Sequence, residues 1–303
     1  RRPPRSTPKP SSAASDVYKR QGYLAIVRQL LECGANVKDC NEGGDTPLHI
    51  AAKIGFTEVC VALIDYGSNL EEADQEGNTP LLLATKEFQS NTISSLLWRG
   101  ANIDAFDKQK LTPLLLAAIT GNLVLVEQLL ERGASMKHRS KDGTSPLHVA
   151  AKLGMNEMCA ILIDHGANLE EKDQEGNTPV LLATKGCHSS TVSALFESGA
   201  KINVSDKGGL TPLMVATQAG HVGLMEKLLE FGGWSLQNYD TNKAGNVNLV
   251  NHLLVAANTG NLALVEKLLE CGDILKHRNK DGYSPLHVVA TVSYTHLTLP
   301  TKA

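Results

Sequence analysis

Apolar and polar blocks follow one another in a fixed order along most of this 303-residue chain. Residues 112–144 show the pattern: an apolar run rich in Ala and Leu at 113–120, a second segment at 123–132, and a polar run ending at Gly143. In the second segment, Val126, Leu129 and Leu130 have the i, i+3, i+4 spacing of a half-buried helix. The pattern predicts two short helices followed by a hairpin-like loop, which we call a finger.

This pattern recurs with a period of 33 residues. Its copies begin with a hydroxyl residue followed by Pro, at Thr46, Thr79, Thr112, Ser145, Thr178 and Thr211. Further copies begin near Asn251 and at Ser284. The hydroxyl can cap free backbone N–H groups and Pro fits the first helical position, so each pair predicts the start of a helix. A period of this length is typical of a solenoid of stacked repeats.

Three copies carry the same short box, T-P-L-H-I-A-A at 46–52, S-P-L-H-V-A-A at 145–151 and S-P-L-H-V at 284–288. Together with the G-A or G-S pairs near the end of each second helix, these boxes resemble the ankyrin repeat. The resemblance covers about Gly22 to Thr291. It implies an all-α ankyrin-repeat solenoid of stacked helix-turn-helix units with protruding β-hairpin-like fingers.

We expect the array to occupy residues 22–291, with a partial repeat at 22–45, repeats starting at 46, 79, 112, 145, 178, 211 and 251, and a partial repeat at 284–291. The two ends differ from the array. D-V-Y-K-R-Q at 16–21 and V-S-Y-T-H at 292–296 can be encoded by reverse-complementary DNA, as in a translated sequencing adaptor. We therefore expect residues 1–21 and 292–303 to be artefactual tails, the first one disordered, and the array to be a fragment of a longer one.

A longer period of 99 residues lies over the first, because E-E-A-D-Q-E-G-N-T-P at 71–80 returns as E-E-K-D-Q-E-G-N-T-P at 170–179. The repeats starting at 79 and 178, which we call second-type repeats, have Phe88 and Cys187 where the other repeats have a mid-repeat Gly. Polar residues at 89–92 and 188–191 favour caps and turns, so we expect their second helices to be shorter or softer. The wider spacing from Thr211 to Asn251 predicts an extended finger within 232–250.

Composition narrows the classes of protein. A hydrophobic content of 42% and a charged content of 20% indicate a folded chain. The net charge of −3 gives no electrostatic argument for nucleic acid or an anionic membrane surface, and no apolar run is long enough to span a bilayer. The six cysteines form no C-x-x-C, and Cys60 and Cys159 share a repeat position. We expect reduced, packed cysteines in a cytoplasmic or nuclear protein that is not secreted.

Three histidines, His49, His148 and His287, invite a metal or catalytic interpretation, but all lie in the P-L-H box. The resemblance implies that they tie neighbouring repeats together through hydrogen bonds. The chain has no H-E-x-x-H, Walker loop or G-x-S-x-G. We therefore expect no enzyme, catalytic residue, metal or cofactor. The residues expected to be structural are Thr46, His49, Thr79, Thr112, His148, Thr178, Thr211 and His287.

The fingers carry most of the candidate binding residues. Two fingers are acidic, with Glu71, Glu72, Asp74 and Glu76 in one and Glu170, Glu171, Asp173 and Glu175 in the other. Two are basic, with Lys137, His138, Arg139 and Lys141 in one and Lys276, His277, Arg278 and Lys280 in the other. Neighbouring fingers can compensate each other's charge, which stabilises an exposed pair little. Alternatively, they form a charge-striped groove that steers a complementary partner.

Aromatic residues add two further expectations. Trp234 and Tyr239 lie in the extended finger and suit an interface anchor, although Trp234 can equally cover the gap that the insertion opens. Trp98, at the end of a second helix, is expected to be a packing residue.

The resemblance implies a protein-binding module, with the concave face of fingers and first helices as its recognition surface. We expect a monomeric, rigid scaffold or adaptor with a protein partner, no nucleic acid and no membrane span in this chain. Two alternatives stay open: the cytoplasmic ankyrin domain of an ion channel, or the regulatory or targeting arm of an enzyme such as a kinase or a ubiquitin-ligase component. A membrane segment or a catalytic motif beyond Thr291 would separate them.

Overall fold

The computed structural model describes residues 23–231, 265, 266, 284 and 287. The chain divides into two compact units, unit 1 at residues 1–141 and unit 2 at residues 142–303. The extended finger expected within 232–250, both expected tails and nearly all of the array beyond 231 lie outside the described residues.

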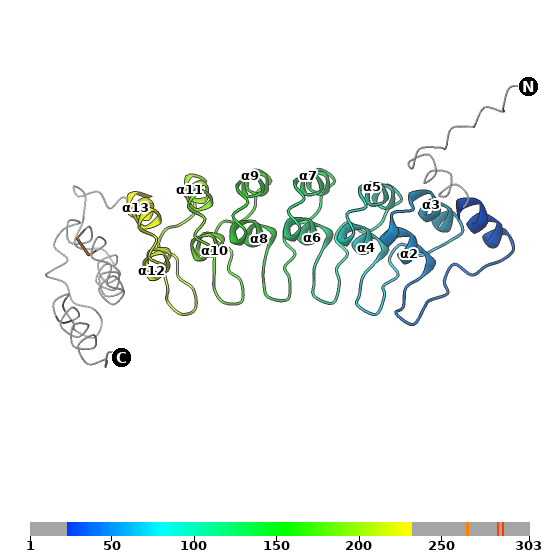
Figure 1. The fold of residues 1–303 in the computed structure, drawn as a ribbon, viewed down its shortest axis with the longest axis horizontal. Coiled ribbons are helices and arrows are strands. Elements are labelled where there is room, and N and C mark those ends of the chain that lie inside the picture. Colours follow the sequence, from blue (N-terminus) through cyan, green and yellow to red (C-terminus); the bar gives the residue numbers. More distant parts are fainter. Residues whose placement is uncertain (1–22, 232–264, 267–283, 285–286, 288–303) are drawn as a thin grey trace, which may run out of the picture. The chain divides into compact units, whose positions relative to one another are not determined.

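Unit 1 is a stack of helix pairs. Residues 23–32 are helical. The pairs that follow are α2 (Pro47–Ile54) with α3 (Thr57–Asp65), α4 (Pro80–Lys86) with α5 (Ser90–Trp98), and α6 (Pro113–Ile119) with α7 (Leu123–Glu131). The first helices α2, α4 and α6 lie in one row, the second helices α3, α5 and α7 in another, and the fingers project beside the first helices (Figure 1).

Unit 2 repeats this arrangement with three more pairs. They are α8 (Pro146–Lys152) with α9 (Asn156–Asp164), α10 (Pro179–Lys185) with α11 (Ser189–Glu197), and α12 (Pro212–Gln218) with α13 (Val222–Phe231). First helices pack on first helices, α8 on α10 and α10 on α12, and second helices on second helices, α9 on α11 and α11 on α13.

The core of each unit lies between the two rows of helices. The predicted stripe is buried, since Val126 and Leu129 are fully enclosed and Leu130 is 8% exposed. Along residues 23–231 there are helices and turns but no strand, so the fingers are hairpin-like loops rather than paired strands. The all-α fold of stacked helix-turn-helix units is confirmed.

The hydroxyl–Pro pairs begin the first helices. Thr46 has an extended backbone, its side chain accepts a hydrogen bond from the His49 N–H, and Pro follows it at the first helical position. Thr79, Thr112, Ser145 and Thr211 cap their helices in the same way. Thr178 departs from this, because its buried Oγ1 makes no hydrogen bond with the described part of the chain.

The second helices of the second-type repeats are not short. α5 and α11 have nine residues each, as α3, α7 and α9 do, so the prediction of a shorter helix is wrong. Their polar residues are satisfied by the preceding repeat: Thr92 Oγ1 lies 2.8 Å from Thr57 Oγ1, and Thr191 Oγ1 donates to Asn156 Oδ1 at 2.5 Å. Tertiary hydrogen bonds therefore outweigh the low helix propensity of these residues.

The mid-repeat turns of the second-type repeats are strained. Phe88 and Cys187 have φ of 58° and 60°, in the left-handed region that other repeats reach with glycine. The next residue reaches back to the preceding repeat, where His188 Nε2 donates to Lys152 O at 3.0 Å. A Cβ on Gly154 would lie 2.5 Å from the His188 ring, so this contact requires a glycine.

Candidate functional site

Each finger is shaped by one residue at its tip. Asp74 Oδ1 accepts hydrogen bonds from the backbone N–H groups of Glu76 at 2.8 Å and Asn78 at 2.7 Å. Burial alone would raise the pKa of Asp74, but hydrogen bonds from Asn78 and Glu76 outweigh it and lower that pKa. Asp173 makes the matching bonds to the N–H groups of Glu175 and Asn177 at 2.9 and 2.8 Å. These two predicted binding residues thus hold the turns of their own fingers.

Neighbouring tips are joined by one backbone hydrogen bond each. In unit 1, Lys108 N donates to Glu76 O at 3.0 Å and Lys141 N to Gln109 O at 2.9 Å. In unit 2, Lys207 N donates to Glu175 O at 2.9 Å. A glycine permits this approach, because a Cβ on Gly77 would lie 2.9 Å from Lys108 N. The tips therefore form a regular series within each unit.

The turn bonds within fingers and the bonds between neighbouring fingers together form what we call the frame. The first glutamate of each acidic finger contributes a bond to it. Glu71 Oε1 accepts from the backbone N–H of Asn102, at the base of the next finger, at 2.7 Å. Glu170 Oε1 accepts from Lys201 N at the same distance. Their negative charges are directed at backbone N–H groups of the next repeat rather than at lysines of a neighbouring finger.

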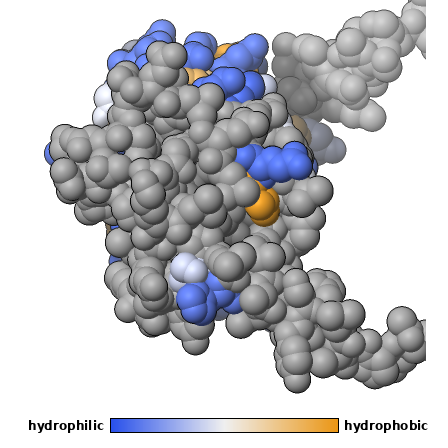
Figure 2. Space-filling model, turned by 90° about the vertical axis from the view of Figure 1, so that its left-hand side faces the viewer, coloured by the Kyte–Doolittle hydropathy of each residue, from blue (hydrophilic) through white to orange (hydrophobic). Residues whose placement is uncertain are grey.

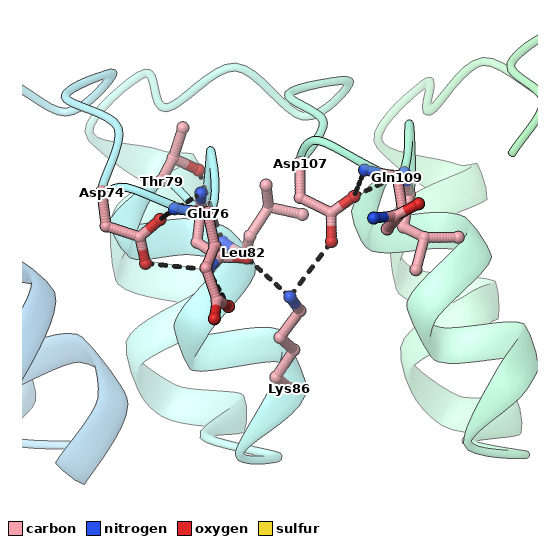
Figure 3. A network of polar contacts seen from close by, with 9 residues as sticks. Asp74, Glu76, Thr79, Leu82, Lys86, Asp107 and Gln109 are labelled. Carbon is pink, nitrogen blue, oxygen red and sulfur yellow. Dashed lines mark hydrogen bonds and ion pairs between the residues drawn. The ribbon is translucent and has the colours of Figure 1, made fainter. Parts of the chain in front are cut away.

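In each second-type repeat, a lysine at the end of the first helix bonds to two neighbouring fingers, an arrangement that we call a latch; Figure 3 shows the latch formed by Lys86. Lys86 Nζ donates to Asn78 Oδ1 at 2.6 Å and to Asp107 Oδ2 at 3.1 Å. Lys185 Nζ donates to Asn177 Oδ1 at 2.6 Å and to Asp206 Oδ2 at 3.0 Å. The sequence analysis missed this role, and the signal for it was L-L-A-T-K, which stands at both 82–86 and 181–185.

The latch affects the acid it holds. Burial raises the pKa of Asp206, but hydrogen bonds from Leu210 N and Lys185, together with the lysine charge, outweigh burial and lower it below the ordinary value. The Asp206 carboxylate is therefore held charged within its finger.

The box histidines join the repeats that carry the P-L-H box to the repeat that follows. His49 Nδ1 accepts from Thr46 N at 3.1 Å, so its Nε2 carries the proton and donates to Asn78 O at 3.0 Å. His148 makes the matching bonds to Ser145 N at 3.3 Å and Asn177 O at 3.0 Å, and burial lowers its pKa. His287 is exposed, with its Nδ1 2.6 Å from Ser284 Oγ.

The basic finger of unit 1 is partly folded back on itself. Arg139 Nη1 donates to the carbonyls of Met136 and His138 at 2.5 and 2.6 Å. His138 Nε2 lies 3.8 Å from Asp104 Oδ2. Lys137 and Lys141 are exposed.

The remaining predicted residues divide into two groups. Glu72, Glu76 and Glu175 are exposed, and Glu171 is half-buried. The residues that fall outside the described part of the chain are Trp234, Tyr239, Lys276, His277, Arg278 and Lys280.

The prediction that Trp98 is a packing residue is wrong, because its side chain is 78% exposed. The Arg99 guanidinium lies 5.7 Å from the Trp98 ring centroid and pairs with Asp65 at 2.5 Å. The reason is position: Trp98 ends α5 at a place where the other second helices of the two units carry Asp65, Glu131, Asp164, Glu197 and Glu230.

Most of the exposed aromatic side chains among the described residues belong to unit 1. Tyr66, Phe88, Trp98 and Phe106 are 46%, 54%, 78% and 56% exposed. Their counterparts 99 residues later are His165, Cys187, Glu197 and Ser205. In the side view, hydrophilic side chains predominate where described residues reach the surface and hydrophobic ones stand singly (Figure 2).

Among the described residues, no group of three or more His, Cys, Asp or Glu side chains is arranged to hold a metal ion. Within the same part of the chain, no helix is both long and apolar enough to cross a membrane.

A family model described as ankyrin repeats, in three copies, matches residues 13–107, 87–173 and 167–240. The chain belongs to the ankyrin repeat family. Ankyrin repeats are generally non-enzymatic modules that bind other proteins, so the array is a protein-interaction module. In a comparison with curated proteins, none matches the chain.

Proposed function

We propose that this ankyrin array acts as a rigid recognition scaffold, whose fingers and first helices hold a protein partner. One observation carries the proposal: the fingers of both units have the same hydrogen-bonded frame, whereas exposed residues differ between corresponding fingers. Asp74 and Asp173 hold the same turn with bonds of 2.7–2.9 Å, yet the residues before them are Ala73 and Lys172. A frame of this kind presents chosen side chains without ordering a loop on binding, which limits the entropy lost.

The charge-striped groove is the more specific version of this proposal. The structure supports it in one respect, because Glu72, Glu76, Lys137 and Lys141 are exposed within unit 1. Charge reversal of Lys137, Arg139 and Lys141 to Glu tests it. We expect unchanged helicity and weaker, less salt-dependent partner binding, since exposed charges mainly affect association rate and specificity.

The free cysteines support a reducing compartment. Cys33, Cys40, Cys60, Cys159 and Cys187 are all unpaired. Burial raises the pKa values of Cys60 and Cys159 to about 12, which suits inert packing residues. We propose a cytoplasmic or nuclear location on this ground.

Hydrogen exchange on a bound complex tests the recognition surface. Binders selected from displayed protein fragments should slow amide exchange in the fingers 69–78, 101–111, 168–177 or 200–210 and in the first helices. Protection confined to the second helices α3, α5, α7, α9 and α11 would contradict the proposal, as would a selection that yields no binder.

A further inference from the structure

The finger at residues 104–111 differs in its exposed side chains from its counterpart at 203–210. Both have the same backbone frame, with Asp107 N bonded to Leu111 O and Asp206 N to Leu210 O, each at 3.2 Å. Phe106, 56% exposed, stands where the counterpart has Ser205, and Lys110 stands where it has Gly209.

Lys110 occupies a position that favours glycine. Its φ of 59° is in the left-handed region, which L-residues enter at a cost. The other fingers place Gly44, Gly77, Gly143, Gly176 and Gly209 there. A glycine would adopt this backbone conformation without strain. The lysine is strained here but places a positive charge at the tip of the finger.

The acids of this finger are occupied internally. Asp107, 5% exposed, accepts from Lys86 Nζ at 3.1 Å and from Gln109 N and Leu111 N at 2.9 and 3.0 Å. Asp104 accepts from Ser135 N at 2.9 Å. The negative charge of the finger is therefore directed into the frame.

The lysine side chains of this finger, unlike its aspartates, are not bonded to the rest of the described chain. Lys108 and Lys110 are exposed and make no side-chain hydrogen bond or ion pair with the described residues. The next finger, joined by Lys141 N to Gln109 O at 2.9 Å, adds the exposed Lys137 and Lys141. The finger thus exposes a phenyl ring and two lysines within five consecutive residues, 106–110, and the complement of this combination is an apolar side chain near carboxylates.

We propose that the finger at 104–111 docks an acidic protein segment that carries a bulky apolar side chain. The apolar residue packs on Phe106, and the carboxylates pair with Lys108 and Lys110. The proposal rests on the recognition function above and specifies the partner for one part of that surface.

A nucleic acid would also bring negative charge, but the neighbouring surface disfavours it. The preceding finger, joined through Lys108 N to Glu76 O at 3.0 Å, exposes Glu72 and Glu76. These carboxylates repel a long, uniformly charged polyanion, whereas a short acidic segment can end before it reaches them.

Random peptides displayed on phage and selected on the folded chain provide the test. Three variants are compared with the native chain: Phe106→Ser, Lys110→Gly and the two together, which import the residues of the 203–210 finger. The control is Trp98→Glu, which removes an exposed aromatic residue at the end of α5, outside this finger, and imports the residue at Glu197. Circular dichroism confirms that each variant keeps its helices.

We expect the selected peptides to be rich in Asp and Glu next to Leu, Phe or Trp. The double variant should bind them at least about ten-fold more weakly, in the range of an interface hot spot, while the control binds normally. The Lys110→Gly variant should also show a weaker dependence of affinity on salt.

The outcomes separate the two proposals. If no peptide is enriched, the recognition function fails, and this inference fails with it. If peptides are enriched without an acidic and apolar signature, or bind the double variant as well as the native chain, the inference alone is wrong. Competition by a single-stranded oligonucleotide as strong as that by free peptide would also overturn it.

Discussion

Residues 46–111 of unit 1 and 145–210 of unit 2 hold their repeats together with almost the same polar contacts. The bonds from His49 to Asn78 O and from His148 to Asn177 O are both 3.0 Å. The latches formed by Lys86 and Lys185 differ by 0.1 Å in their distance to aspartate. Contacts between repeats are kept because losing one partner leaves a buried polar group unsatisfied.

The exposed surfaces of the same two regions have diverged. Phe88, Trp98 and Phe106 of unit 1 correspond to Cys187, Glu197 and Ser205 of unit 2. Exposed positions are not coupled to packing, so they can change without cost to the frame. The comparison shows that the two regions share their hydrogen-bonded contacts and differ in the residues at exposed positions.

The largest expected effect comes from removing a box histidine. His49→Ala and His148→Ala each take away a capping interaction and an inter-repeat hydrogen bond and leave a cavity. Each should lower the free energy of unfolding by about 2–4 kcal/mol, measured by urea denaturation. His165→Ala, at an exposed site, is the control. A loss in one unit but not in the other would break the equivalence of the two frames.

Removing the latch should have a smaller, pH-dependent effect. Lys185→Met leaves the Asp206 carboxylate, 8% exposed, without its cation and should cost about 1–2 kcal/mol at neutral pH. The pKa of Asp206 is lowered in the folded state, so its stabilisation is present above the unfolded pKa of about 3.9 and is lost as pH falls through the folded value.

Urea denaturation of the native chain and the Lys185→Met variant at several pH values checks this prediction. The gap in stability between them should narrow in acid, to the part that comes from the Lys185–Asn177 hydrogen bond. A gap that keeps its full size after the Asp206 carboxyl is protonated would rule out the ion pair as its cause.

Relieving the strained turns should stabilise the chain. Phe88→Gly and Cys187→Gly replace L-residues that have a left-handed backbone conformation. Each should raise the free energy of unfolding by about 0.5–1 kcal/mol, a figure that already includes the greater flexibility of glycine in the unfolded chain. Gly121→Ala, with φ of 71°, is the reverse control and should destabilise. Loss of stability in Cys187→Gly would mean that the thiol contributes packing that outweighs the strain.

The smallest effect is expected at Trp98. Because its side chain is 78% exposed, Trp98→Glu should change the free energy of unfolding by less than about 0.5 kcal/mol. The contribution of Trp98 to the fluorescence of the native chain, which is the part that Trp98→Glu removes, should be that of a solvated indole. A blue-shifted spectrum, or a loss above that limit, would restore the packing interpretation.

Local chemistry accounts for the part of the fold that sequence analysis predicted. The Thr–Pro and Ser–Pro pairs begin the first helices because capping depends on residues within one turn, as Thr112 and Leu115 show. The stripe of Val126 and Leu129 is buried because its spacing matches the helical period. These features need no knowledge of neighbouring repeats.

Apart from the histidine bonds that the family resemblance implied, contacts across repeats were the part that could not be predicted. Lys86 reaches Asp107, 21 residues away, and Glu71 reaches Asn102, 31 residues away, so both depend on how one repeat lies on the next. For the same reason Thr92, which has a low helix propensity, sits inside a full-length α5 once Thr57 supplies its hydrogen bond.

By itself, the sequence determined the repeat, its period, its caps and its apolar stripe, because these follow from spacing and from local hydrogen bonding. Only the tertiary structure decided which charges belong to the frame and which to the surface. Asp74 and Glu72 look alike in the sequence, but one holds a turn and the other is exposed. That division is set by the distance of each side chain from backbone groups: Asp74 reaches N–H groups of its own finger once the turn has formed, whereas Glu71 reaches the next finger, a contact that stacking fixes.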